Sequence, residues 1–151
     1  MKENSNQHNA RELLRRSRVE VDPGTFVFVS MPHSAFATLL HDARIGPRGA
    51  GPFMIFFDRH EVTLVLEEAD FAATRSAISD AKIERGYRLV TFDLVLDPNV
   101  TGFIALISEI LAEAGVPVMA ISAFSRDHVL IRQQDLATAL RALSPHVAEL
   151  C

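Results

Sequence analysis

The sequence predicts an α+β fold in which two βαββαβ units follow each other along a chain of 151 residues. Short runs rich in valine, isoleucine and phenylalanine are typical of half-buried strands. One segment in the second half repeats its apolar residues with the period of a helix that buries a single face. The order strand, helix, strand, strand, helix occurs twice, clearly in the second half and more faintly in the first.

The composition bounds the size and the setting of the protein. Apolar residues make up 48% and charged residues 23% of the chain, which suits one compact core or two fused halves. A formal net charge of −4 argues against general nucleic-acid binding, which needs a cationic surface. The single cysteine, Cys151, excludes an intramolecular disulfide and any Cys-x-x-Cys metal site. With no long apolar run and no secretory signal, we expect a cytoplasmic protein.

Residues 1–17 are predicted to form a flexible polar leader. The segment is rich in Asn, Gln, Ser and charged groups, and only Leu13 and Leu14 offer neighbouring apolar anchors. Two such residues do not offset the conformational entropy that is lost when the segment becomes ordered. Its arginines could contact an acidic partner, but a solvated tail or a short surface helix is the preferred interpretation.

The first unit is predicted at residues 18–90. Asp22-Pro23-Gly24 is a turn signal between two strands, and Ser34 is placed to cap a short helix. The glycines and prolines at 46–52 force a loop, and the three residues 58–60 have the spacing of a hairpin loop. The expected elements are strands at 19–21, 25–30, 53–57 and 61–66, helices at 34–42 and within 68–81, and a long strand or bent pair at 87–96.

The second unit is predicted at residues 91–151, and its helix at 103–114 follows the i, i+3, i+4, i+7 rule throughout. Asn99 or Thr101 can cap the start of this helix, and Gly115 supplies the left-handed residue that often ends one. Strands at 118–124 and 128–131 and a helix at 135–143 complete the pattern.

A last strand is missing from the second unit, because Ser144 and Pro145 interrupt the chain after the final helix. The sheet of this unit would then end in an unpaired edge, which is an aggregation liability. The strand at 19–21 is extra to the first βαββαβ repeat, which begins with the strand at 25–30, and is free to cover that edge. We therefore expect the N-terminal strand to complete the sheet of the C-terminal unit.

Characteristic residues occur in several segments from position 84 onward: ERGYR at 84–88, Leu96-Asp97, Thr101-Gly102, AEAGVPVMAIS at 112–122, Phe124, Asp127, VLI at 129–131 and DLATALRAL at 135–143. Together they resemble small tandem ACT-domain proteins, similar to the ACT modules of the CASTOR arginine sensors and, more distantly, of aspartate kinases. The resemblance implies ferredoxin-like units that bind a free amino acid or another small effector, often at an interface between ACT units. It implies regulation rather than catalysis, and we expect a homodimer.

The resemblance also implies where the ligand binds. Sites in that family use the loop from the first strand to the first helix, here 96–102, and the end of the next strand with its turn, here 121–127. The implied ligand-binding residues are Asn99, Val100, Thr101, Gly102, Ile121, Ser122, Phe124, Ser125 and Asp127. The first half of the chain matches the family only loosely, since its loop at 46–52 is longer than usual.

The residue types at this predicted site suit a zwitterion. Backbone amides at Thr101 and Gly102 would open a helix and attract a carboxylate. Asp127 could face an ammonium group, and Phe124 could cover an aliphatic part of the ligand. Each of these residues also has a structural explanation, as a helix cap, a turn residue or a core residue. Arg126 beside the site would repel a cationic side chain, so we expect a neutral or acidic amino acid as the ligand.

Other chemistry finds little support in the sequence. Six histidines occur, but none has the His-x-x-x-His or His-Glu-x-x-His spacing that places two metal ligands on one helix face. The sequence contains neither a nucleophile elbow nor a phosphate loop, so we expect no enzyme activity, no metal site and no cofactor. The alternative function is a ligand-free ACT assembly module that mediates oligomerisation through its edge strands.

Overall fold

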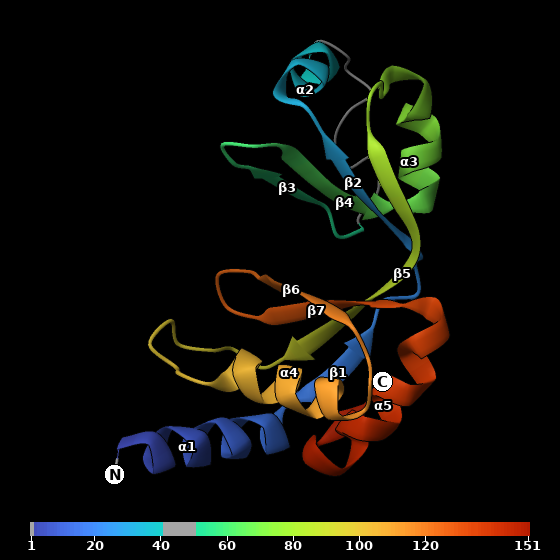
Figure 1. The fold of residues 1–151 in the computed structure, drawn as a ribbon. Coiled ribbons are helices and arrows are strands. Elements are labelled where there is room, and N and C mark those ends of the chain that lie inside the picture. Colours follow the sequence, from blue (N-terminus) through green and yellow to red (C-terminus); the bar gives the residue numbers. More distant parts are fainter. Residues whose placement is uncertain (1, 41–50) are drawn as a thin grey trace. The chain divides into compact units, whose positions relative to one another are not determined.

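The computed structural model describes the backbone of residues 2–40 and 51–151 (Figure 1). The side chains of residues 2–8, Thr74 and Ala77 are not described. The end of the helix predicted at 34–42 and most of the loop predicted at 46–52 lie outside the described residues.

Contacts within the chain divide it into two units. The terminal unit contains residues 1–23 and 88–151, and the internal unit contains residues 24–87. This division differs from the predicted boundaries after residues 17 and 90. The N-terminal segment belongs with the C-terminal part of the chain, because its strand and its helix pack there.

The terminal unit has the strand order β6-β7-β5-β1-β8. Its elements are α1 (Lys2–Arg16), β1 (Arg18–Val21), the second part of β5 (Lys82–Asp93), α4 (Phe103–Glu113), β6 (Val118–Ser122), β7 (Asp127–Arg132), α5 (Leu136–Leu143) and β8 (Glu149–Leu150). Short 3-10 helices precede and follow α5, at Gln133–Asp135 and Ser144–His146.

The N-terminal strand completes the sheet of the C-terminal part of the chain, as predicted. β1 pairs with β5 in antiparallel register, with Val19 opposite Phe92. β8 then pairs in parallel with β1, with Arg18 opposite Glu149. The sequence does not predict β8, because the segment is very short and lies just after a proline. By pairing with β1, the end of the chain covers an edge that would otherwise stay open.

The core of the terminal unit lies between its sheet and its helices. The helix α4 contributes Phe103, Ile107, Ile110 and Leu111, which form the single buried face that its apolar period predicts. Buried partners from the strands and from α5 are Val19, Val90, Phe92, Val129, Ile131, Ala139 and Leu143. Full burial of a large apolar side chain contributes about 1.5–3 kcal/mol, so this face holds α4 firmly on the sheet.

Both ends of α4 use a glycine with positive φ. At the C-terminal end, Gly115 has a φ of 73° and ends the helix as predicted. At the N-terminal end, the predicted caps Asn99 and Thr101 are wrong, since the N-cap is Gly102 with a φ of 82°. Among the described residues no side chain caps α4, because Asn99 instead forms a turn with Asp97.

Residues 2–16 form the helix α1, which differs from the flexible leader that the sequence predicts. Ala10 and Leu14 are each 1% exposed, and Leu14 belongs to the core of the terminal unit. Contacts join α1 to α4, and Figure 1 shows the two helices side by side. A polar helix of this length is marginal on its own, so α1 depends on packing that the segment's own sequence does not reveal.

The internal unit has the strand order β3-β4-β2-β5. Its elements are β2 (Phe26–Met31), α2 (His33–Leu40), β3 (Met54–Phe57), β4 (Val62–Glu67), α3 (Glu68–Thr74), a 3-10 helix at Arg75–Ala77 and the first part of β5. Alternate residues of β2 and β4 are buried together with Phe36 and Leu39 of α2 and Phe71 of α3. Both helices therefore pack against one face of this sheet.

The long strand β5 begins at Lys82 rather than at the predicted residue 87, and it ends at Asp93 rather than at residue 96. Its first residues include charged side chains, which obscure the strand pattern in the sequence. Pairing with β2, with Ser30 opposite Lys82, holds this part of the strand. The residues after Asp93 form the loop that leads into α4.

The two units share one topology, which confirms the predicted tandem α+β fold. In the internal unit the strands, counted along the chain, lie in the order fourth, first, third, second, and in the terminal unit the N-terminal strand β1 takes the fourth place. This order is β1-β5-β7-β6 in the terminal unit and β5-β2-β4-β3 in the internal unit, so β5 serves both. The arrangement is the expected ferredoxin-like one. Of the helices in the described residues, none has the length and apolar character needed to cross a membrane.

Candidate functional site

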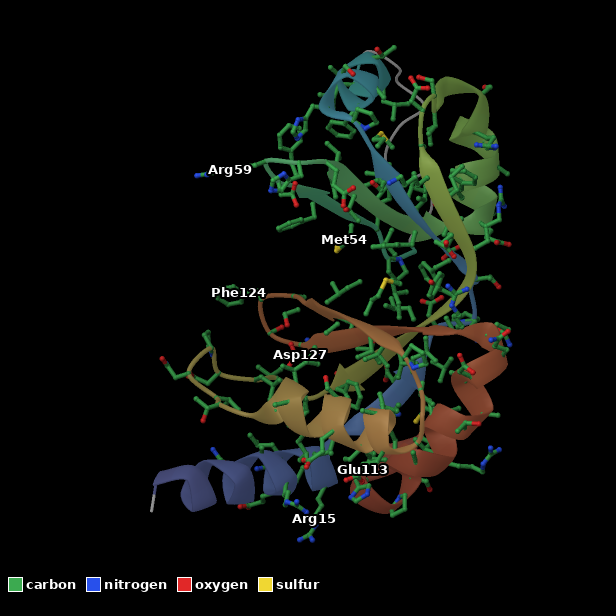
Figure 2. The ribbon with its side chains drawn as sticks, in the orientation of Figure 1. Arg15, Met54, Arg59, Glu113, Phe124 and Asp127 are labelled. Carbon is green, nitrogen blue, oxygen red and sulfur yellow. The ribbon has the colours of Figure 1, made fainter. Side chains whose placement is uncertain are left out.

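A cavity of about 290 Å³ lies in the terminal unit, between the loop that leads into α4 and the turn that joins β6 to β7. The lining residues are Leu96, Asp97, Pro98, Val100, Gly102, Phe103, Ile104, Ser122, Ala123, Phe124, Ser125, Arg126 and Asp127. The sequence-based expectation that Gly102 and Asp127 lie together is thus met. Figure 2 labels Phe124 and Asp127, which both come from the β6–β7 hairpin.

One backbone hydrogen bond joins the two walls of the cavity, and a second closes the turn that forms one of them. The N–H of Leu96 donates to the carbonyl of Ser125 at 2.9 Å, which links the loop to the turn. Within the turn, the N–H of Ala123 donates to the carbonyl of Arg126 at 2.9 Å. The bond from Leu96 to Ser125 holds the loop beside the turn without any contribution from side chains.

The start of α4 offers hydrogen-bond donors to the cavity. Gly102, Phe103 and Ile104 all line it, and Gly102 as N-cap has no side chain to occupy the first amides. The first intrahelical bond runs from the N–H of Leu106 to the carbonyl of Gly102, at 3.0 Å. Free amides and the helix dipole together favour an anionic group at this end of the helix.

Asp127 offers the matching acceptor. It is the first residue of β7, and its Oδ1 accepts a hydrogen bond from the Ser122 hydroxyl at 2.6 Å. A carboxylate has about four acceptor positions, so this bond orients the group without using its capacity. Asp127 can therefore accept from an ammonium group in the cavity.

Asp97 places a second carboxylate at the cavity. Its Oδ1 accepts from the backbone N–H of Asn99 at 2.8 Å and from the Asn99 side-chain amide at 2.9 Å. These hydrogen bonds lower the pKa of the Asp97 carboxyl below its ordinary value, so it stays ionised at neutral pH. The Asp-Pro-Asn sequence is a turn signal, and that signal could have identified Asp97 before the structure.

Arg126 is paired with an acidic side chain. Its Nε lies 2.7 Å from Oδ1 of Asp93, and the two side chains are 39% and 31% exposed. The sequence argument against cationic ligands assumed an unpaired guanidinium at this position. Because Asp93 offsets its charge, Arg126 repels a cation in the cavity less than that argument requires.

Six of the nine predicted site residues line the cavity: Val100, Gly102, Ser122, Phe124, Ser125 and Asp127. Asn99, Thr101 and Ile121 do not line it. The Asn99 side chain bonds to Asp97 instead, and Ile121 precedes Ser122 on β6, so the two side chains point to opposite faces of the sheet. Phe124 is not in the predicted strand, since β6 ends at Ser122. At 93% exposed it lies at the mouth of the cavity rather than in the core.

His128 follows Asp127 on β7 and is half-buried. Its Nδ1 lies 2.9 Å from the hydroxyl oxygen of Thr91. Burial lowers the pKa of the imidazole below its ordinary value of 6.5, with Asp127 opposing and Arg126 adding to the change. The folded protein therefore favours neutral His128.

No cluster of three or more His, Cys, Asp or Glu suited to a metal ion occurs in the described part of the chain.

We expect this histidine to make the protein less stable in mild acid. Since the folded-state pKa is lowered, its contribution is complete above the unfolded-state pKa, near 6.5, and is lost as the pH falls below it. His128→Gln, which cannot titrate, should flatten the dependence of the unfolding free energy on pH. Urea denaturation from about pH 8 to about pH 5 measures this. A variant that keeps the full wild-type slope would contradict the assignment.

Comparison with known proteins gives a family for part of the chain. Residues 82–145 match the family model of the ACT domain. This match contains α4, the β6–β7 hairpin and every residue that lines the cavity. A search of curated proteins gave no match by sequence.

Solved structures share the fold. A protein of Agobacterium tumefaciens is 18% identical, with a TM-score of 0.67 over 90% of this chain and 92% of that one. The ligand-free regulatory subunit of aspartate kinase from Thermus thermophilus is 16% identical, with a TM-score of 0.57 over 83% and 96%. The aspartate kinase of Clostridium acetobutylicum, described as allosteric, is 13% identical, with a TM-score of 0.62 over 85% and 34%. Residues 82–145 therefore match the ACT-domain family, and the chain shares its fold with aspartate kinase regulatory domains.

Proposed function

We propose that the chain is a regulatory module that binds a free amino acid in the cavity of the terminal unit. The ACT match and the aspartate kinase neighbours support a regulatory module that binds a small molecule. One observation carries the proposal: the uncapped start of α4 and the carboxylate of Asp127 line the same cavity. The amides suit the ligand carboxylate, and Asp127 suits its ammonium group.

The size of the cavity supports a ligand of this kind. About 290 Å³ lies at the lower end of the range of small-molecule sites, roughly 300–1,000 Å³. Val100, Phe103 and Ile104 add apolar surface beside the polar groups. We propose a neutral or acidic amino acid first, and cationic ones are included in the test because Arg126 is paired with Asp93.

We further propose that the protein is a cytoplasmic homodimer in which a second copy covers the mouth of the cavity. Two large apolar side chains support this proposal, Phe124 at 93% and Val95 at 68% exposed. Phe124 lines the cavity, and Val95 directly precedes Leu96, which also lines it and bonds to the β6–β7 turn. Exposed apolar groups at a site mark surfaces that another molecule covers.

A second candidate function is assembly without a ligand. It is favoured by the edge strand β3, where Ile55, Phe56 and Phe57 are 45%, 59% and 60% exposed. An uncharged apolar edge strand is prone to pair with another chain. Under this alternative the protein would oligomerise, but no amino acid would change its stability.

The two candidate functions predict different effects of an added amino acid on the thermal stability of the protein. A molecule that binds only the folded state raises the unfolding midpoint as its concentration rises, and a pure assembly module shows no such change. The twenty proteinogenic amino acids, added singly, should include at least one that raises the midpoint. If none does, the binding proposal is wrong and the assembly function remains.

The glycines that flank α4 provide a matched pair of variants. Gly102 and Gly115 have φ of 82° and 73°, so alanine at either position should cost about 1–2 kcal/mol of stability. Added Cβ atoms would meet only Ala10 at 3.9 Å in the first case and nothing within 4 Å in the second. We expect both variants to unfold at similar urea concentrations, and only Gly102→Ala to lose the midpoint shift with an amino acid. Loss of the shift in both variants would remove Gly102 from the site.

A further inference from the structure

The internal unit contains a counterpart of the hairpin that forms one wall of the cavity. In the terminal unit, Ser122 lies opposite Asp127, and the turn between them is closed by the bond from Ala123 to Arg126. In the internal unit, Phe57 lies opposite Val62, and the N–H of Asp58 donates to the carbonyl of Glu61 at 3.1 Å. Both turns have four residues, so Phe57 takes the position of Ser122.

The last residue of each turn is tied to the end of the unit's first strand. In the terminal unit, Arg126 pairs with Asp93, the last residue of β5. In the internal unit, the Ser30 hydroxyl, near the end of β2, donates to the Glu61 carboxylate. The two units therefore hold their turns in the same place relative to their first strands.

The units differ in the loop that follows the first strand. Nine residues separate β5 from α4, and they form the other wall of the cavity. Only Pro32 separates β2 from α2, so α2 begins directly at His33. A loop of one residue cannot leave the space that a loop of nine residues leaves between a helix start and a turn.

His33 and Phe57 bridge the corresponding position in the internal unit. Their rings are stacked, with centroids 4.4 Å apart and planes 20° apart. The His33 Nε2 lies 2.7 Å from the carbonyl oxygen of Asp58, the first residue of the turn. The first residue of α2 thus contacts the hairpin directly, whereas the start of α4 and its hairpin line a cavity.

We infer that the position in the internal unit that corresponds to the ligand cavity is closed by the unit's own side chains, His33 and Phe57, so that each chain binds one amino acid, in the terminal unit. The part that concerns the amino acid rests on the proposed function. The closure by His33 and Phe57 does not, because it depends on contacts within the internal unit alone.

Nuclear Overhauser effects test the closure without any ligand. We expect cross-peaks between the ring protons of His33 and Phe57, and upfield-shifted His33 ring protons whose shift is lost in Phe57→Ala. The matched control is Phe56→Ala, because Phe56 is equally exposed on the same strand but points to the opposite face. Absent cross-peaks in the wild type, or an equal loss of the shift in both variants, would overturn the closure.

Amide chemical-shift mapping tests the number of sites. With the twenty proteinogenic amino acids added singly, a binder should shift the amides of Gly102 and Ser125 and leave those of His33, Phe57 and Glu61 in place, saturating at about one equivalent. Shifts in the internal unit with saturation at about two equivalents would overturn the inference while keeping the proposed function. If no amino acid shifts any amide, the proposed function and the single site both fail, and the His33–Phe57 cross-peaks still decide the closure.

Discussion

Leu14→Ala is expected to lower the free energy of unfolding by about 2–5 kcal/mol, as truncation of a buried leucine usually does. Leu14 is 1% exposed and packs into the core of the terminal unit. It is also one of the few apolar residues that hold α1 on α4, so its loss weakens both the core and the helix. Urea denaturation followed by circular dichroism measures the change.

The control for this variant is Glu12→Ala, two residues earlier on α1. Glu12 is exposed, and a surface substitution on a helix usually changes stability by less than about 0.5 kcal/mol. A flexible leader would give equal and negligible effects for both variants. Equal effects would therefore contradict the packing of α1 and restore the prediction made from the sequence.

The difference between α1 and α4 shows which parts of the fold the sequence can predict. α4 has apolar residues at each position of one face, so its existence and its buried side follow from periodicity alone. α1 has only Ala10, Leu13 and Leu14 as apolar contacts among its described side chains, and its order comes from α4. β8 likewise could not be predicted from the sequence, because its two residues form a strand only by pairing with β1.

Some features of the candidate site could likewise be predicted from the sequence, and others could not. The two segments of the cavity could be located from the resemblance, and Gly102, Ser122 and Asp127 all line it. The ion pair between Arg126 and Asp93 could not be predicted, because it joins residues 33 positions apart. The exposure of Phe124 depends on where β6 ends, which is one of the least certain features of a strand prediction.

Replacement of Asp127 by asparagine should separate ligand binding from folding. Asparagine keeps the shape of the side chain and an oxygen that can accept from Ser122, so stability should stay close to that of the wild type. It removes the charge that we assign to the ligand ammonium group. A hydrogen bond to a charged group contributes about 1.5–3 kcal/mol, so affinity should fall by about 10- to 100-fold. Calorimetric titration with the amino acid that gives the largest thermal shift in the wild type measures this loss.

The matched control is Glu113→Gln, which also converts a carboxylate to an amide. Glu113 is the last residue of α4, is exposed, and does not line the cavity. Glu113 lies at the opposite end of α4 from the cavity, and salt largely screens an exposed charge placed there. This variant should therefore bind with wild-type affinity. If Asp127→Asn also binds like the wild type, the ammonium group lies elsewhere, and Asp97 becomes the remaining carboxylate of the cavity that could accept from it.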